Sequence, residues 1–600
     1  MANTQKSYWA GSRVGRRSVL RGVGFGAAGL AGAALIGCSA GSKTAPAPTV
    51  KAATDNAKPR RGGTVRTVFS FDQDPDSFDW LLGLNPKSSY PAQAVYSRLM
   101  KYDIGNNSAA PGTVSGDLVE KWEQPDPLTV ILHLRQNAMW DRRAPTNGRK
   151  VVADDVVKSF EKFAAKSGYR ASLANSVNKD APLVKFEAVD DKTLKAKLAF
   201  PDALFLTALA APLSFAVMPM ESMNGGFDPN ADMRGSGPFI MTEFTPSVGM
   251  KYKRNPDWHF GPDRPYIDNM EHRIMGAPAQ MEAQFRAGNL EYLGAGNTQL
   301  RTQLPIIAKA MKDAQIVKQA PPATGQVLGF SFNADQPWKD VRLRRAISMC
   351  IDRSTLRDVI SAPKDYEDIG VKMGNYWNTP INAGFGKSWL DPQGKDFGPA
   401  AQYMQYNVAE AKKLLSAAGY TDQKPLSFEY QHSDPHYKTQ DMVETVQSML
   451  TKAGMQVKLY NADYSTWWVP KNLRGKGKFK SSTGTGNVVS TNSNSNQGDP
   501  VLWAYTWQLS TGSMTTAGTE FPALDDIIRK ARGIFDFEAR KEIVHEMQRF
   551  MVDNMVQVPT GAEVDIPNIS RKNLHGPEQY KSYLNAAPIA EEYPYYWMDA

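Results

Sequence analysis

Residues 129–163, TVILHLRQNAMWDRRAPTNGRKVVADDVVKSFEKF, contain a strand pattern followed by a helix pattern. The first residues alternate, which places Val130, Leu132 and Leu134 on one face of a predicted strand. Later, apolar residues recur at helical spacing behind two acids, which are favourable near a helix N-terminus: Asp154, Asp155, Val156, Phe160 and Phe163. A strand followed so closely by an amphipathic helix indicates an α/β fold.

The same alternation continues on both sides of this stretch. Residues 184–189 and 193–198 flank Asp190-Asp191 and predict a hairpin. Residues 407–419 predict a helix that Asn407 caps and Gly419 ends, and residues 441–454 repeat the plan. Cys350 belongs to an apolar stripe, so it is predicted to be a core residue rather than a nucleophile. The chain from residue 62 onward is therefore predicted to be α/β throughout.

Composition and charge exclude several classes of protein. The 600 residues are 42% apolar and 22% charged, which is typical of globular chains with more than one core. Residues 1–61 hold ten of the 70 Lys and Arg but one of the 61 acids, so 60 of each sign remain in the body. A neutral body gives no electrostatic footprint for nucleic acid. Two cysteines and seven scattered histidines argue against a disulfide scaffold or a dense metal centre, and we expect no cofactor.

The N-terminal region has the pattern of an export signal. Residues 15–21, GRRSVLR, precede sixteen small or weakly apolar residues, too few to span a bilayer stably. The paired arginines resemble a twin-arginine signal, and residues 35–38, LIGC, resemble a bacterial lipobox, which implies lipid attachment at Cys38. We expect residues 1–37 to be a twin-arginine-like lipoprotein signal and residues 38–61 a flexible tether. The alternative is an ordinary signal with an incidental cysteine.

Several blocks, in order, resemble the extracytoplasmic solute-binding proteins of peptide-type ABC importers. This is bacterial solute-binding protein family 5, with dipeptide-, oligopeptide-, nickel- and some oligosaccharide-binding members. The blocks are GDLVEKWE (116–123), LHLR (132–135), ADDVVKSF (153–160), GSGPF (235–239), RNPDW (254–258), FSFN (330–333), DVRLRRAI (340–347) and IDR (351–353). The resemblance extends from residue 62 to about residue 590.

The resemblance implies a bilobal, hinge-closing periplasmic-binding-protein fold, type II and cluster C-like, with an extra inserted subdomain. Lobe I would comprise residues 62–83, 214–322 and 556–600, with the inserted subdomain at 84–213 and lobe II at 323–555. Hinge segments are expected near Pro322-Ala323 and Val558-Pro559, and closure would follow ligand binding between the lobes. Arg135, Asp155, Asp352 and Arg353 would be ion pairs or caps of the scaffold.

The anchors that dipeptide-binding members use are replaced in this chain. In those members an acid just before Gly-Asp-Pro receives the peptide ammonium, and an arginine on a strand-end loop receives the carboxylate. Here Gly498-Asp499-Pro500 is present, but Asn496 stands at the acid position, and residues 481–498 contain no acid. The arginine position falls on His432 or Ser433. Both anchors for a zwitterion are therefore expected to be missing.

Neutral polar groups and aromatic rings replace these anchors. Amides bond hydroxyls as donor and acceptor, and aromatic faces cover apolar ring surfaces. The pattern favours a neutral polar solute such as an oligosaccharide, or a peptide held by its backbone; the alternative is that the tryptophans are core. The predicted ligand-binding residues are Tyr464, Trp467, Asn487, Asn496, Asp499, Trp503, His432 and Ser433, with Trp468 and Trp507 as further aromatic candidates.

The sequence therefore predicts a binding protein without catalytic or metal-ligating residues. Its expected partners are a small-molecule or short-oligomer ligand, an ABC permease and ATPase complex, and the membrane through its lipid anchor. We expect a monomer, held at the cell membrane and facing the periplasm or the exterior. Two alternatives remain open: an exported glycoside hydrolase, and a ligand-sensing lipoprotein that presents its ligand to a receptor.

Overall fold

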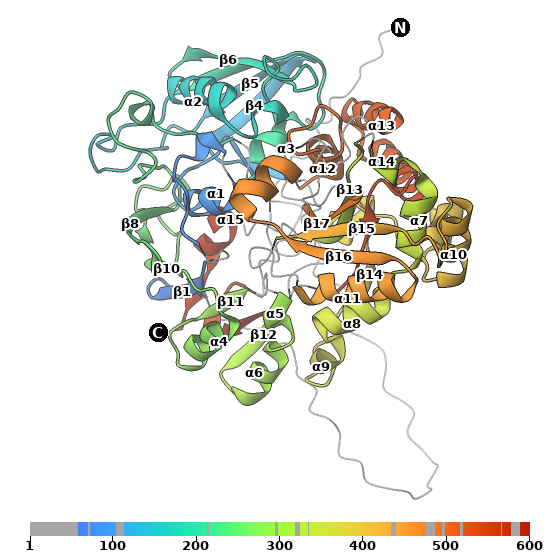
Figure 1. Ribbon diagram of the computed structural model, residues 1–600. Helices are drawn as coiled ribbons and strands as arrows, with labels where there is room; N and C mark the ends of the chain where they lie inside the picture. The colour runs from blue at the N-terminus through green and yellow to red at the C-terminus, as the bar shows by residue number, and fades with distance from the viewer. Residues whose placement is uncertain are drawn as a thin grey trace, which may run out of the picture. The chain divides into compact units, whose positions relative to one another are not determined.

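A computed structural model describes the chain from residue 58 to residue 599 (Figure 1). The ranges outside the description within this span are 70–72, 84, 104–112, 213–214, 295–297, 319–323, 334, 434–439, 474, 476–485, 495–497, 516–519, 566 and 578–588. Residues 57–600 cluster as one compact unit. Three large β-sheets organise its described part.

The first sheet has seven strands drawn from distant parts of the chain. Their order is β12-β20-β11-β1-β10-β9-β8, with bounds Ala314–Lys318, Pro567–Arg571, Tyr292–Gly294, Thr64–Val68, Asn269–Arg273, Gly249–Arg254 and Phe239–Thr245. β1 pairs in parallel with β10 and β11, and β20 pairs antiparallel with β11 and β12. Helices α4 (Pro278–Arg286) and α6 (Leu304–Ala310) supply Phe285 and Ile307 to the core beneath Ile569 of β20.

The second sheet is antiparallel and has the order β4-β5-β7-β6. Its strands are Val119–Asp126, Thr129–Leu134, Thr193–Leu198 and Leu183–Asp190, and α2 (Ala153–Lys166) packs against β6. Phe160 and Phe163 of α2 meet Phe215, and Phe160 also meets Phe186 edge to face. Each buried phenylalanine contributes roughly 2–3 kcal/mol through its apolar area. The helix at residues 153–166 and the hairpin around Asp190-Asp191 are as predicted from the sequence.

The third sheet has the order β16-β15-β17-β13-β18. Its strands are Gln456–Asn461, Ser427–His432, Gly486–Asn494, Thr324–Phe330 and Val558–Pro559. β15 pairs in parallel with β16 and with β17, while β13 pairs antiparallel with β17 and β18. The chain passes between the first and third sheets twice, once between β12 and β13 and once between β18 and β20.

Helices cover the apolar face of the third sheet. Leu343 and Ile347 of α7 (Val341–Met349) and Met442 and Val446 of α11 (Gln440–Lys452) share its core. In α10 (Val408–Ala417) the Asn407 side chain accepts a hydrogen bond from the Glu410 amide, as the sequence predicted. The remaining α-helices described in this region are α8 (Arg353–Ser361), α9 (Pro363–Glu367), α12 (Pro500–Trp507), α13 (Pro522–Arg532) and α14 (Phe537–Asp553).

Cys350 lies in the core at the end of α7, where only 1% of its surface is exposed. Burial raises the pKa of its thiol to about 12. A thiol with so high a pKa stays protonated and unreactive at neutral pH, since the thiolate is the nucleophile. The prediction that Cys350 is a core residue is therefore confirmed.

Candidate functional site

Most of the candidate residues follow the carboxyl ends of three parallel strands. His432 ends β15, Tyr464 lies three residues after β16, and Asp499 lies five residues after β17. The Ala462 amide donates to the His432 carbonyl over 2.7 Å, which joins the ends of β15 and β16. Because β15 is parallel to both neighbours, the three strands point to the same edge of the sheet, and β17 extends past the level ends of β15 and β16. Ligands of open α/β sheets bind outside such an edge.

Asn487 is the exception. Its backbone pairs with Glu429, three residues before His432 along β15, so it lies about 10 Å back from the edge. The strand β17 runs on to Asn494. Asn496 itself lies outside the described residues. The structure thus brings together the ends of β15 and β16, and leaves Asn487 within the sheet.

The aromatic candidates differ in burial. Tyr464, Trp467 and Trp468 lie on the helix Tyr464–Leu473, where Tyr464 and Trp468 are buried and Trp467 is half-buried. The rings of Trp467 and Trp468 lie 6.2 Å apart. Trp503 is fully buried in α12, and Trp507 is half-buried at its end. Of the four tryptophans, Trp467 and Trp507 therefore retain exposed ring surface.

Asp499 caps α12. Its Oδ1 accepts hydrogen bonds from the amides of Val501 at 2.8 Å and Leu502 at 3.3 Å, and its Oδ2 lies 3.8 Å from an Arg540 nitrogen. Burial raises the pKa of this carboxyl. The helix N-terminus and the arginine together offset the cost of burying it. These contacts already occupy much of its hydrogen-bonding capacity.

Gly498 brings the start of α12 against Tyr102, the last residue of β2 (Met100–Tyr102). A Cβ at Gly498 would stand 2.5 Å from the Tyr102 ring, and its φ of +67° favours glycine. The Tyr102 hydroxyl donates to the Thr207 carbonyl in α3 (Phe205–Ala210) at 3.4 Å. The backbone at residues 498–500 therefore packs closely against Tyr102 of β2, which in turn is bonded to α3.

The structure adds polar residues that sequence reasoning missed. Gln431 donates to Glu429 Oε1 over 2.6 Å, but its own Oε1 is buried without a hydrogen-bond partner among the described residues. In the same described set, both amide atoms of Asn472 and Nε1 of Trp503 are also buried and unbonded. Such atoms call for a partner, a water or a ligand group. The available signal was the polar pair Glu429 and Gln431 in an otherwise buried strand.

The residues expected to belong to the scaffold do so. Arg135 Nε donates to the Asp117 carbonyl at 2.7 Å, and Asp352 accepts hydrogen bonds from the first amides of α8. Asp155 pairs with Arg149 and accepts a hydrogen bond from the Val152 amide at the start of α2. Arg353 is 1% exposed and donates to the carbonyls of Pro559 and Met404. Arg353 thereby ties α8 to the second chain passage between the sheets.

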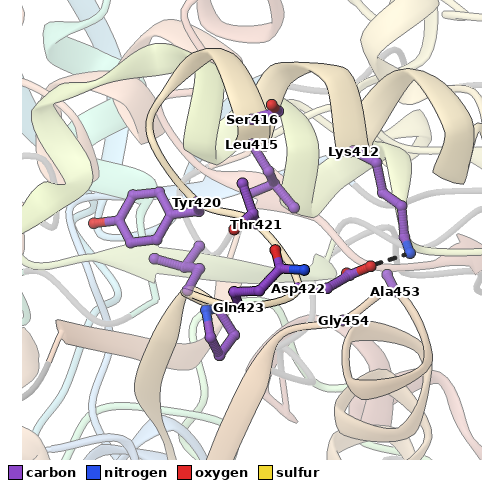
Figure 2. Close-up of a pocket in the computed structure, with 11 residues that line it drawn as sticks. Lys412, Leu415, Ser416, Tyr420, Thr421, Asp422, Gln423, Ala453 and Gly454 are labelled. Atoms are coloured by element: carbon purple, nitrogen blue, oxygen red, sulfur yellow. Dashed lines mark ion pairs between the residues drawn. The ribbon is translucent and has the colours of Figure 1, made fainter.

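A separate hollow lies at the ends of α10 and α11 (Figure 2). Its eleven lining residues include none of the sequence-predicted candidates. Lys412 and Asp422 pair across it at 3.7 Å, but both are substantially exposed, so the pair contributes little. This hollow offers no buried charge or unbonded polar atom, and we do not assign it to the site.

Among the described residues, no helix is both long and apolar enough to cross a membrane. Within the same residues, no group of three or more His, Cys, Asp and Glu side chains is placed to hold a metal ion.

Comparisons with known proteins identify what the chain is similar to. The profile of "Bacterial extracellular solute-binding proteins, family 5 Middle" matches residues 113–514. Dipeptide-binding protein DppE of Bacillus subtilis is 22% identical over 548 residues, 88% of this chain and 91% of that protein. The DppA structure from Helicobacter pylori, in complex with the peptide STSA, superposes with a TM-score of 0.72 at 19% identity over 90% of this chain and 99% of that one. The AgaA structure from A. tumefacien R10, in complex with agropinic acid, gives 0.71 at 20% identity with the same coverage.

Proposed function

Because the chain belongs to the bacterial extracellular solute-binding proteins of family 5, and has their type II periplasmic-binding-protein fold, we propose that it captures a neutral solute between two lobes for an ABC importer. The observation that carries the ligand class is the lack, among the described residues, of a free acid beside the carboxyl ends of β15, β16 and β17, where the Asp499 carboxylate is already engaged by the α12 amides and lies near Arg540. Charged ends of a free dipeptide require charged partners when they are buried. Residues 481–498 supply no acid for its ammonium.

The ligand class is an oligosaccharide or a peptide held through its backbone. Tyr464 and Trp467 supply aromatic surface, and Asn496 and Ser433 supply neutral hydrogen-bonding groups. Gln431 and Asn472, with their unbonded amide atoms, extend this neutral set. One solved structure of this fold is a complex with agropinic acid and another is a complex with the peptide STSA, so the fold alone leaves the ligand open.

Hinge closure is the proposed mechanism. Lobe I would comprise residues 62–83, 214–322 and 556–600, the inserted subdomain 84–213, and lobe II 323–555. The two passages between the first and third sheets support this division, because each is a single run of chain on which the lobes could turn. A ligand that contacts both lobes only in the closed form shifts the population toward that form.

Calorimetry tests the ligand class. We expect micromolar or tighter binding of a neutral oligosaccharide or a longer peptide, and no measurable binding of simple dipeptides. Asn496→Asp should weaken a neutral ligand by about 1–3 kcal/mol, because it replaces an amide donor with a charge. Asn289→Asp, at an exposed position outside the candidate set, is the matched control and should leave the affinity unchanged. Micromolar binding of an ordinary dipeptide by the unmodified protein would overturn the assignment.

We further propose that lipid at Cys38 holds the protein at the membrane as a monomer. The LIGC sequence at residues 35–38 supports this, and residues 1–57 lie outside the described part of the chain. Replacing Cys38 with serine should move the protein from the membrane fraction to the soluble fraction without changing ligand affinity. Membrane attachment that persists in the Cys38→Ser variant would contradict the lipobox assignment.

A further inference from the structure

Helix α13 of proposed lobe II contacts the proposed inserted subdomain through charged side chains, and α12 contacts it through Tyr505. Arg529 and Arg532 of α13 reach Asp180 and Asp202 of the subdomain, and we call these four residues the clasp. The partners in the second pair are 330 residues apart in the sequence. No other element holds these two parts through two arginine–carboxylate pairs in the described chain.

The Arg532–Asp202 pair is the buried half of the clasp. The side chains of Arg532 and Asp202 are 5% and 0% exposed, and an Arg532 nitrogen donates to Asp202 Oδ2. A second Arg532 nitrogen donates to the Asp180 carbonyl at 2.9 Å, and the Ala203 amide donates to the Arg532 carbonyl at 3.1 Å. The guanidinium lies 4.0 Å from the centre of the Tyr505 ring. A charge so deeply buried is stable only while its partner remains in place.

The Arg529–Asp180 pair is the exposed half. Arg529 donates to both carboxylate oxygens of Asp180, at 2.9 and 3.1 Å, and Thr511 donates to Asp180 Oδ2 at 2.7 Å. Asn178 adds a hydrogen bond to the Tyr505 hydroxyl at 3.1 Å. Arg529 keeps 43% of its side-chain surface exposed, so this half is open to solvent.

The contact is polar and has a hollow beside it. The hollow, of about 310 Å³, is partly open to solvent, and its lining comes from both parts, including Phe200, Pro201, Tyr505 and Leu509 beside the clasp. Polar contacts of this kind are typical of parts that move relative to one another.

We propose that the clasp sets the balance between the closed and open forms of the empty protein, an inference that rests on the proposed hinge mechanism. In the closed form the Arg532 and Asp202 charges are desolvated and neutralise one another. In the open form both charges face water and need no partner. Removing one charge therefore raises the free energy of the closed form alone, because the other charge is left buried without a partner. Removing both charges leaves no unpaired ion in the closed form.

The test uses the full-length protein without ligand, so it does not depend on which solute binds. Amide hydrogen exchange at Ala203, whose hydrogen bond to the Arg532 carbonyl crosses the contact, reports separation of the two parts. Asp202→Asn should speed exchange there on the order of a hundredfold, and the double variant Asp202→Asn with Arg532→Gln should recover most of the protection. Glu161→Gln on α2, which removes a carboxylate from an exposed pair with Lys158, is the matched control and should change nothing.

Three outcomes would overturn the clasp. Unchanged exchange at Ala203 in the Asp202→Asn variant would show that the pair does not hold the parts together. Equal acceleration in the amides of β5 and β7 would show global destabilisation of a permanent joint. If the Ala203 amide exchanges as fast in the double variant as in the single variant, burial of an unpaired charge is not the cause of the faster exchange. Calorimetry on the unmodified protein separately tests whether a solute binds at all.

Discussion

His272 should make the stability of the protein depend on pH between about pH 4 and 6.5. It lies on β10 with 3% of its surface exposed, and its ring is 5.5 Å from that of Tyr252 and 5.7 Å from that of Tyr593. Neither ring nitrogen has a hydrogen-bond partner among the described residues. Burial lowers the pKa of His272 to about 4 from 6.5, because the site disfavours the charged ring.

The sign of the effect follows from proton uptake. Between pH 6.5 and 4 the unfolded chain binds a proton at His272 and the folded chain does not, so stability falls as pH falls through this window. At roughly 1.4 kcal/mol per pKa unit, the full loss is about 3 kcal/mol. The stability is complete above the unfolded pKa and changes no further below about pH 4.

Urea unfolding across this pH window measures the effect. His272→Phe keeps a ring of similar size but cannot titrate, so the variant should lack about 3 kcal/mol of the pH dependence of the unmodified protein. Tyr252→Phe is the matched control, because it removes a neighbouring buried hydroxyl and leaves His272 in place. Identical pH profiles for the unmodified protein and the His272→Phe variant would refute the reasoning.

Two further substitutions test the scaffold around the site. Asp155→Asn should lower the free energy of unfolding by about 3 kcal/mol, because Arg149 loses a buried partner and α2 loses a capping carboxylate. Asp154→Asn, at the exposed neighbouring position, should lower the free energy of unfolding by less than about 0.5 kcal/mol in the same urea titration. Gly498→Ala should cost about 1–3 kcal/mol, since it places a Cβ against the Tyr102 ring at a positive φ. Adding Tyr102→Leu should recover the steric part of that loss but not the backbone part, and full recovery in thermal unfolding would argue against backbone strain.

Local signals predicted the individual elements well. The cap at Asn407, the alternation at residues 129–134 and the acids before Val156 are each set by neighbours within a few residues, so one sequence suffices to find them. The sequence selected His432 from its place in the family resemblance and Tyr464 from its aromatic ring; that they follow neighbouring parallel strands is seen only in the structure.

Register and long-range pairing lay beyond that reasoning. Asn487 was grouped with the edge residues, but β17 extends to Asn494, and strand length depends on pairing with β13. Asp499 caps α12 and lies near Arg540 of α14, and this second contact depends on tertiary packing that the sequence does not show. The partner of Arg532 is 330 residues away, and no spacing rule in a single sequence identifies such a partner.

The position of β20 has a consequence for how the chain acquires its structure. β20, at Pro567–Arg571, lies between β11 and β12 in the interior of the first sheet. During synthesis, β1, β11 and β12 emerge hundreds of residues before the strand that must separate β11 from β12. Loop-closure entropy makes such distant pairings slow, and unfilled strand edges are prone to aggregate while they wait. The nascent chain must therefore keep these two edges from joining wrongly until β20 is made, so that residues 567–571 are needed to complete a sheet whose first strand is made at residues 64–68.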